Sequence, residues 1–280
     1  AAVGRLFAIG ETIWLPDEKY ARTPTLQSMH KDLRPPLVGA FAHDIDCENS
    51  EVRLICSLAE RYGLERLIPS LYDYKNHRTW WLDRITKLHS TTENIAKRLL
   101  HILLSGGRYQ AWLQLVAPEH HFIDPSVQRF TFRLRDEMGA LRDALVDRPR
   151  FAWTKLHRAA LKRKGKSDAD IATLMIPRII ASCENDVLDI MHWNFSKWGW
   201  MVRAKIFDGM IVEPWISTRL SLPEAMRQVE VACEKEGWDV KLVEKGLHGK
   251  QDDIIPTIEA ARRVTREVAD FSTIPRTTCY

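Results

Sequence analysis

The stretch from Phe41 to Leu58, FAHDIDCENSEVRLICSL, most constrains what this chain can fold into. A short apolar run opens it and predicts a buried strand over residues 37–46. The apolar periodicity that follows predicts a helix over residues 49–62. Asp44 and Asp46 therefore stand where a strand gives way to a helix. Carboxylates at such a point can bind a divalent cation at a cleft floor, or they can cap the helix and face solvent.

A second stretch, MVRAKIFDGMIVEPW, begins at Met201. Apolar and polar residues alternate up to Ile206, and a second apolar run follows Gly209. An Asp-Gly pair between two such runs is a strong signal for a β-hairpin. We therefore expect Asp208 at a tight turn between two antiparallel strands, where simple turn chemistry is the alternative to a catalytic role.

Residues 92–104, TENIAKRLLHILL, predict a helix that Thr92 caps and Ser105-Gly106-Gly107 ends. Lys97, His101 and Ser105 recur every four residues and so share one face. This face is either solvated or able to bind a phosphate. Beyond this helix, Trp112 is a candidate for stacking on a nucleic-acid base.

The rest of the chain predicts mainly helices, with one more strand. Helices are expected within residues 126–174, then over 176–197, 222–236 and 255–271, and a strand over 239–243. Ser167 is expected to cap a short helix before the one that starts at Ile176. Helices mixed with antiparallel strands indicate the α+β class.

The charge of the chain is unevenly distributed. The net charge is +4, but Arg129–Lys166 carries twelve Lys or Arg against four Asp or Glu, a local excess of eight positive charges. Such a segment suits contact with a phosphate backbone, although a solvated helical face explains it as well. With 45% hydrophobic and 28% charged residues, no membrane span and no secretory leader, the composition predicts an intracellular globular protein. The five scattered cysteines are expected to be reduced thiols.

Two aspartates on neighbouring strands, a lysine on a helix and a basic segment suit one kind of chemistry. Two metal ions about 3.5–4 Å apart can stabilise the attacking and leaving oxygens of a phosphoryl transfer. A lysine can neutralise the triphosphate of a nucleotide. The layout predicts a nucleotidyl transferase, and a metal nuclease would need similar acids.

The same residues resemble motifs of the family A DNA polymerases, the DNA polymerase I-like enzymes. Asp46 is followed by Glu51 and Arg53 at the spacing of the family's first palm motif, and Lys97 with Gly106 resembles its fingers-helix motif. Phe207-Asp208-Gly209 with Glu213 partly matches the third motif. Flanking similarities are Gly4-Arg5-Leu6, Pro24-Thr25-Leu26-Gln27 with Arg34, and Glu184 with Asp189.

The resemblance implies a role for each matched residue. Asp46 and Asp208 would be catalytic and would hold two Mg²⁺ ions, with Mn²⁺ as a substitute. At the incoming dNTP, Glu51 would close the space that a 2′-OH needs and Lys97 would bind the triphosphate, beside His101 and Ser105. Four residues would lie near the primer-template: Arg5, Gln27, Arg34 and Glu184. Arg53 would support its motif from behind.

The resemblance also implies an organisation of the chain. Residues 1–62 and 176–250 would form a polymerase palm with an antiparallel sheet, and 63–175 helical fingers. Residues 251–280 would be a C-terminal helical tail. Nothing matches the family's exonuclease or thumb.

Several positions depart from the family pattern. Glu93 stands where the family has Arg, His101 where it has an aromatic residue, and Ser105 where it has Tyr. Phe207 and Gly209 replace the His and Glu that flank the third-motif Asp. These departures imply a looser nucleotide pocket, lower fidelity, and a closer likeness to divergent viral or mobile-element replicases.

The sequence therefore predicts a template-directed DNA polymerase that adds dNTPs to a primer 3′-OH. A polymerase that prefers an RNA template, resembling a reverse transcriptase, is one alternative. An inactive palm that binds nucleic acid without catalysis is another.

Overall fold

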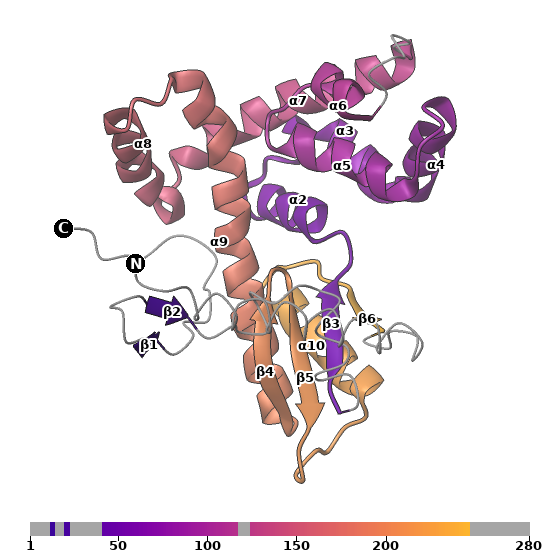
Figure 1. The fold of residues 1–280 in the computed structure, drawn as a ribbon, viewed down its shortest axis with the longest axis vertical. Coiled ribbons are helices and arrows are strands. Elements are labelled where there is room, and N and C mark those ends of the chain that lie inside the picture. The colour runs from indigo at the N-terminus through magenta and orange to yellow at the C-terminus, as the bar shows by residue number, and fades with distance from the viewer. Residues whose placement is uncertain (1–11, 15–19, 23–40, 117–123, 247–280) are drawn as a thin grey trace, which may run out of the picture. The chain divides into compact units, whose positions relative to one another are not determined.

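The computed structural model of this chain describes residues 12–14, 20–22, 41–116 and 124–246 (Figure 1). Within them the fold is mixed and mostly helical, with a four-stranded antiparallel sheet and a two-stranded one. This agrees with the predicted combination of helices and antiparallel strands. The elements are β1 (Thr12–Trp14), β2 (Tyr20–Arg22), β3 (His43–Cys47), α2 (Ser50–Tyr62), η2 (Glu65–Leu67), α3 (Pro69–Asn76), α4 (Arg78–Leu88), α5 (Glu93–Leu104), α6 (Tyr109–Val116), α7 (Pro125–Val146), η3 (Pro149–Phe151), α8 (Trp153–Arg163), α9 (Asp168–Lys197), β4 (Trp200–Ile206), β5 (Gly209–Pro214), α10 (Leu222–Lys235) and β6 (Leu242–Lys245).

The chain divides into two compact units. Among the described residues, the first unit comprises Glu48–Met191 and Val229–Lys241, and the second includes β3, His192–Gln228 and β6. The first unit is helical and the second contains the four-stranded sheet. The division into palm, fingers and tail segments stays a prediction.

The strand order in the larger sheet is β4-β5-β3-β6, so β3 is a central strand (Figure 1). Successive side chains of a strand point to opposite faces. Ile45 and Cys47 are accordingly buried on one face, while Asp44 and Asp46 lie on the other face and are partly exposed. The alternation in HDIDC thus places the two carboxylates together on the more open face.

Among the described residues, the strand expected over residues 37–46 begins at His43. The observed strand runs from His43 to Cys47, residues 37–40 lie outside the described residues, and Phe41 is 52% exposed in a turn. The polar residues His43 and Asp44 pair with β5 through their backbones. Only Cys47 lies beyond the predicted range, and it pairs with Leu242 of β6.

The predicted hairpin is confirmed, with a small difference in its turn. Ile206 pairs with Gly209, so Phe207 and Asp208 form a two-residue loop and Gly209 is the first residue of β5. Phe207 has φ 55°, a left-handed conformation that is strained for a bulky side chain. Such strain persists only where surrounding structure holds it, and it is often found at functional sites.

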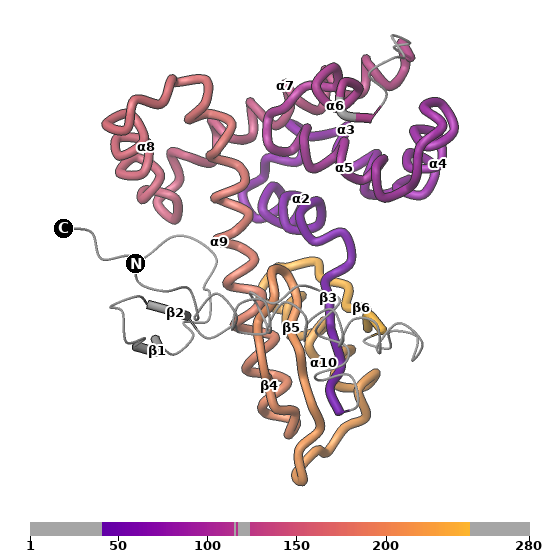
Figure 2. The backbone as a smooth tube through the Cα atoms, in the orientation of Figure 1, coloured from indigo at the N-terminus to yellow at the C-terminus, as the bar shows by residue number. Residues whose placement is uncertain are grey.

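In the helical unit, α5 has the predicted cap and buries its apolar face. The hydroxyl oxygen of Thr92 accepts a hydrogen bond from the Ile95 amide at 3.4 Å. Ala96, Leu99 and Leu103 are fully or almost fully buried. Figure 2 shows α5 among its contact partners α4, α6 and α7.

The candidate role of Trp112 in base stacking is wrong for this structure. Its side chain is 1% exposed, and its indole N–H donates to the Ile95 carbonyl at 3.0 Å. The ring also stacks against Tyr109. Trp112 is a core residue, because α6, which carries it, packs against α5.

The two helices expected on either side of Ile176 form one helix, α9, that contains Pro177. The predicted cap is present, since the Ser167 hydroxyl accepts from the Asp170 amide at 3.1 Å. A proline inside a helix costs about 3 kcal/mol. Ile176 and Ile180, on either side of the proline, are each 5% exposed, and burial of this apolar stripe offsets that cost.

The remaining predictions fall as follows. Helix α10 covers Leu222–Lys235, close to the expected bounds. The strand expected over 239–243 begins later, at Leu242, and the Asp239 amide donates to the Ser57 hydroxyl. The tail helix expected over 255–271 lies outside the described residues.

Candidate active site

The hairpin turn of β4 and β5 lies directly against the end of β3. A Cβ atom built on Gly209 would lie 2.3 Å from the carbonyl oxygen of Ile45, 3.1 Å from the Asp46 Cα and 3.2 Å from the Asp46 Oδ1. Only glycine permits this approach, since real Cβ contacts essentially never fall under 3.0 Å. The turn residue Asp208 is thereby brought to the same end of the sheet as Asp46.

The electrostatics of Asp46 show that the two carboxylates interact. Burial raises the pKa of Asp46, and the nearby charge of Asp208 raises it further, with a smaller contribution from Asp44. Lys245 of β6 forms an ion pair with the Asp46 carboxylate and lowers the pKa in part. The pKa rises on balance because burial and the nearby aspartates together outweigh the effect of Lys245.

This arrangement suits a divalent cation that keeps other ligands. No group of three or more His, Cys, Asp or Glu side chains forms a metal-binding cluster within the described residues. Mg²⁺ usually binds through one or two carboxylates together with water and substrate phosphates, without an all-protein cage. Asp46 and Asp208 match that pattern, and a cation there would relieve the repulsion that raises the Asp46 pKa.

In the helical unit, the residues expected at a nucleotide make specific contacts. The Glu51 carboxylate of α2 lies 2.6 Å from His101 Nδ1 of α5. Lys97 pairs with Glu93 one turn earlier on α5, at 2.7 Å, and this contact lowers the pKa of Glu93. The side chains of Lys97 and Glu93 are 35% and 60% exposed, so both remain accessible to solvent.

Arg53 of α2 belongs to a network of charged side chains centred on Asp239. Arg53 and Lys75 each contact one oxygen of the Asp239 carboxylate at 2.6 Å. The Ser57 hydroxyl accepts from the Asp239 amide at 2.8 Å. Burial alone would raise the pKa of Asp239, but the hydrogen bond from Lys75 and the charge of Arg53 lower it. The network ties α2 to the segment before β6.

The other predicted site residues have different surroundings. Ser105 is the exposed C-cap residue of α5. Glu184 of α9 is only 2% exposed, and this degree of burial does not favour a direct contact with a primer-template. Arg5, Gln27 and Arg34 lie outside the described residues.

Sequence reasoning missed two charged residues of these sites, Lys245 and Asp239. Both are far along the chain from the residues that they contact, and neither belongs to a recognisable local pattern. The alternation of LVEK in β6 gave the only signal, since it puts Leu242 and Glu244 on one face and Lys245 on the other.

The fold is similar to that of a polymerase domain. In particular, the chain is similar to the structure described as "POL domain of Pol1 from M. smegmatis complex with DNA primer-template and dNTP", with a TM-score of 0.51 and 13% sequence identity. The similarity covers 85% of this chain and 46% of that chain, so this chain spans about half the length of its structural neighbour. No protein-family model and no curated protein sequence matches the chain.

None of the helices in the described part of the chain has the length and apolar character needed to cross a membrane.

Proposed function

We propose that this chain is a template-directed DNA polymerase that transfers nucleotides from dNTPs to a primer 3′-OH. The observation that carries this proposal is the approach of the Asp208 turn to Asp46, on a fold similar to that of a polymerase domain. That structural neighbour is a complex with DNA primer-template and dNTP, which supports the same partners here. The resemblance to family A polymerases adds the order of the motifs.

In this proposal Asp46 and Asp208 would hold two Mg²⁺ ions, which when bound would stabilise the attacking 3′-oxygen and the leaving pyrophosphate oxygen. Lys245 pairs with the Asp46 carboxylate, and a bound cation would take over part of that role. Asp46 would thus exchange one positive partner for another, which limits the cost of holding it near Asp208.

The nucleotide contacts in this proposal come from α2 and α5. Lys97 binds the triphosphate after it leaves Glu93, and Glu51 closes the space beside C2′ of the sugar. His101 fixes the Glu51 carboxylate by its short contact. We expect Glu51→Ala to admit ribonucleotides, and unchanged sugar selection would argue against this role.

The deciding experiment is primer extension with Mg²⁺ or Mn²⁺ on DNA and on RNA templates. Asp46→Asn and Asp208→Asn should each abolish extension and leave binding of the duplex nearly intact. Asp83→Asn is a matched control, because Asp83 pairs with Lys87 on the surface of α4, with 54% of its side chain exposed.

The outcomes separate the alternatives. Extension on DNA supports the proposal, and extension on RNA alone supports an RNA-templated polymerase. Duplex binding without extension by the wild-type chain indicates an inactive palm. Wild-type extension by Asp208→Asn refutes the assigned site.

A further inference from the structure

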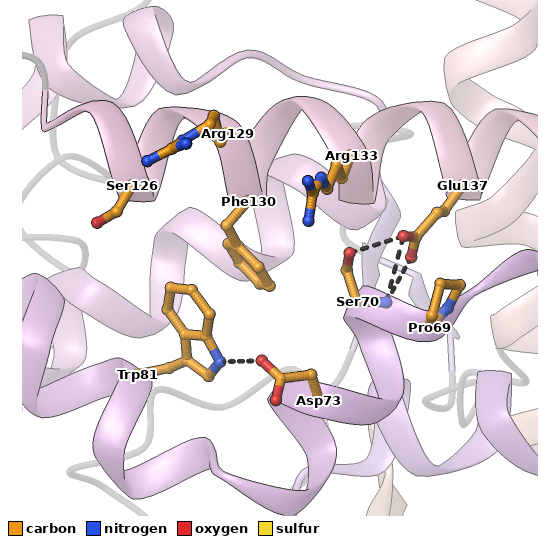
Figure 3. A pocket seen from close by; sticks show the side chains of 9 residues that line it. All are labelled: Pro69, Ser70, Asp73, Trp81, Ser126, Arg129, Phe130, Arg133 and Glu137. Atoms are coloured by element: carbon orange, nitrogen blue, oxygen red, sulfur yellow. Dashed lines mark hydrogen bonds between the residues drawn. The ribbon is translucent and has the colours of Figure 1, made fainter.

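A cavity in the helical unit has features of an anion-binding site that the proposed active-site roles do not use. It lies between α3, α4 and α7 and has a volume of about 580 Å³ (Figure 3). Its lining residues are Pro69, Ser70, Asp73, Trp81, Ser126, Arg129, Phe130, Arg133 and Glu137. Arg129, Phe130, Arg133 and Glu137 follow one another along a single face of α7 (Figure 3).

The two arginines of this cavity differ from the other two arginines of α7. Arg135 and Arg142 each bond the aspartate that follows them, at 3.3 and 2.8 Å. Arg129 and Arg133 are exposed, and neither forms an ion pair with a carboxylate in the part of the chain that the structure describes. The Nε of Arg129 donates to the Pro125 carbonyl, at 3.3 Å. Two guanidinium groups are thus available at one opening.

The carboxylates in the cavity already have other donors. Glu137 accepts from the Ser70 amide at 2.9 Å and from the Ser70 hydroxyl at 2.6 Å. Asp73 accepts from the Trp81 indole N–H at 2.9 Å and lies 2.9 Å from His77 Nδ1. These bonds hold both acids to the cavity wall, but the acids keep their charge, and the charge of Arg133 acts to lower the pKa of Glu137, which burial raises. What the two arginines offer a ligand is therefore their N–H donors at the opening and not a net positive charge of the cavity.

The N-terminus of α7 does not supply these donors. Asp124 caps it by accepting from the amides of Ser126 at 3.0 Å and Val127 at 2.8 Å. The guanidinium groups themselves are therefore the binding groups. Arginine binds phosphate oxygens through paired N–H donors, which gives both strength and geometry.

An exposed aromatic ring lies beside the cavity. Trp81 in the wall stacks on Phe130 with ring centroids 4.0 Å apart, so its face is used. The neighbouring Trp80 packs edge-on against Trp81, at 4.9 Å, and is 54% exposed. The Arg84 guanidinium lies over the Trp80 ring, 5.4 Å from its centre, so the opposite face of this solvent-facing ring is the one on which a nucleic-acid base can stack.

We propose that Arg129 and Arg133 bind the phosphodiester backbone of a single-stranded nucleic acid, with a base stacked on Trp80. The choice of nucleic acid over another polyanion rests on the proposed function and on the basic excess of residues 129–166. The binding assay needs no catalysis, so the two proposals can fail separately.

The test measures binding of a labelled oligothymidylate by fluorescence anisotropy at several salt concentrations. Arg129→Ala/Arg133→Ala should weaken binding about tenfold or more. It should also reduce the slope of log K against log salt by about 0.7 for each lost phosphate contact. Arg135→Ala/Arg142→Ala, from the same helix, is the matched control and should change binding little. Denaturant unfolding checks that both variants fold.

Two further arms identify the ligand. Trp80→Ala should weaken binding of the oligothymidylate and leave binding of an abasic strand unchanged. Inorganic tripolyphosphate and poly-glutamate should compete poorly at equal charge concentration; strong competition by either would mean a small phosphate ligand or an acidic protein and would overturn the inference.

Equal weakening by both double-arginine variants would also overturn it, since it would show only a general charge effect. Asp208→Asn should bind the strand like the wild type. Retained strand binding with no primer extension by the wild-type chain would refute the proposed polymerase and leave this site standing.

Discussion

Replacing Gly209 by alanine tests the contact on which the candidate active site depends. The added Cβ would lie 2.3 Å from the Ile45 carbonyl oxygen, which is 0.7 Å closer than the 3.0 Å limit of real Cβ contacts. The obstacle is backbone in the middle of a sheet, so a rotamer change cannot relieve it. Either the turn moves away from β3 or the strand pairing distorts.

The size of the effect follows from this overlap. Overpacking of this kind costs about 1–3 kcal/mol of unfolding free energy. A displacement of roughly 1 Å between reacting groups reduces turnover by about 100-fold. We therefore expect Gly209→Ala to lower the free energy of unfolding by about 1–3 kcal/mol. We also expect it to lower primer extension far more than this loss of stability explains.

The measurements are urea unfolding followed by circular dichroism, and primer extension well below the unfolding midpoint. Gly139→Ala is the matched control, because a Cβ at this position in α7 meets nothing within 4 Å. That variant should be more stable, by up to about 1 kcal/mol, since alanine favours a helix interior. If Gly209→Ala is as stable and active as the wild type, the turn does not lie against Asp46 and the site is wrong.

Two further predictions concern charged contacts. Glu93→Gln should free Lys97 and lower the KM for dNTP up to about fivefold in steady-state extension, because a surface ion pair is worth at most about 1 kcal/mol. Asp83→Asn breaks an exposed pair of the same spacing and should leave that KM unchanged. An unchanged KM in both variants would mean that Glu93 does not compete for the lysine. Asp239→Asn should destabilise the fold by about 1–2 kcal/mol at pH 7. Because the folded pKa of Asp239 is lowered, its contribution is present above the ordinary aspartate pKa and disappears as the pH falls through the folded value. Thermal unfolding curves of wild type and variant should therefore converge in acid, and a constant difference at all pH values would contradict this reading.

Local chemistry made several elements predictable from the sequence. Thr92 caps α5 as its position suggested, and apolar spacing marked the buried face of that helix. The hairpin could be predicted because a turn between two alternating runs depends on only a few neighbouring residues. The order of Asp46, Glu51, Lys97 and Asp208 along the sequence carries the resemblance to family A polymerases.

Burial and continuity were harder to predict. The sequence around Trp112 suggested a base-stacking residue, yet its side chain is buried against α5. The sequence suggested that a new helix starts at Ile176, but a continuous buried stripe makes α9 one helix through Pro177. In both cases packing with distant residues outweighed a local signal. Sequence patterns alone do not report such packing.

The sequence by itself determined where the acids stand along the chain, the cap of α5 and the β4–β5 hairpin. Only the tertiary structure decided which charges meet: Lys245 with Asp46, Asp239 with Arg53, and the Asp208 turn with the end of β3. The physical reason is range. Capping and periodicity act within a few residues, whereas an ion pair or a close backbone approach depends on how remote segments pack.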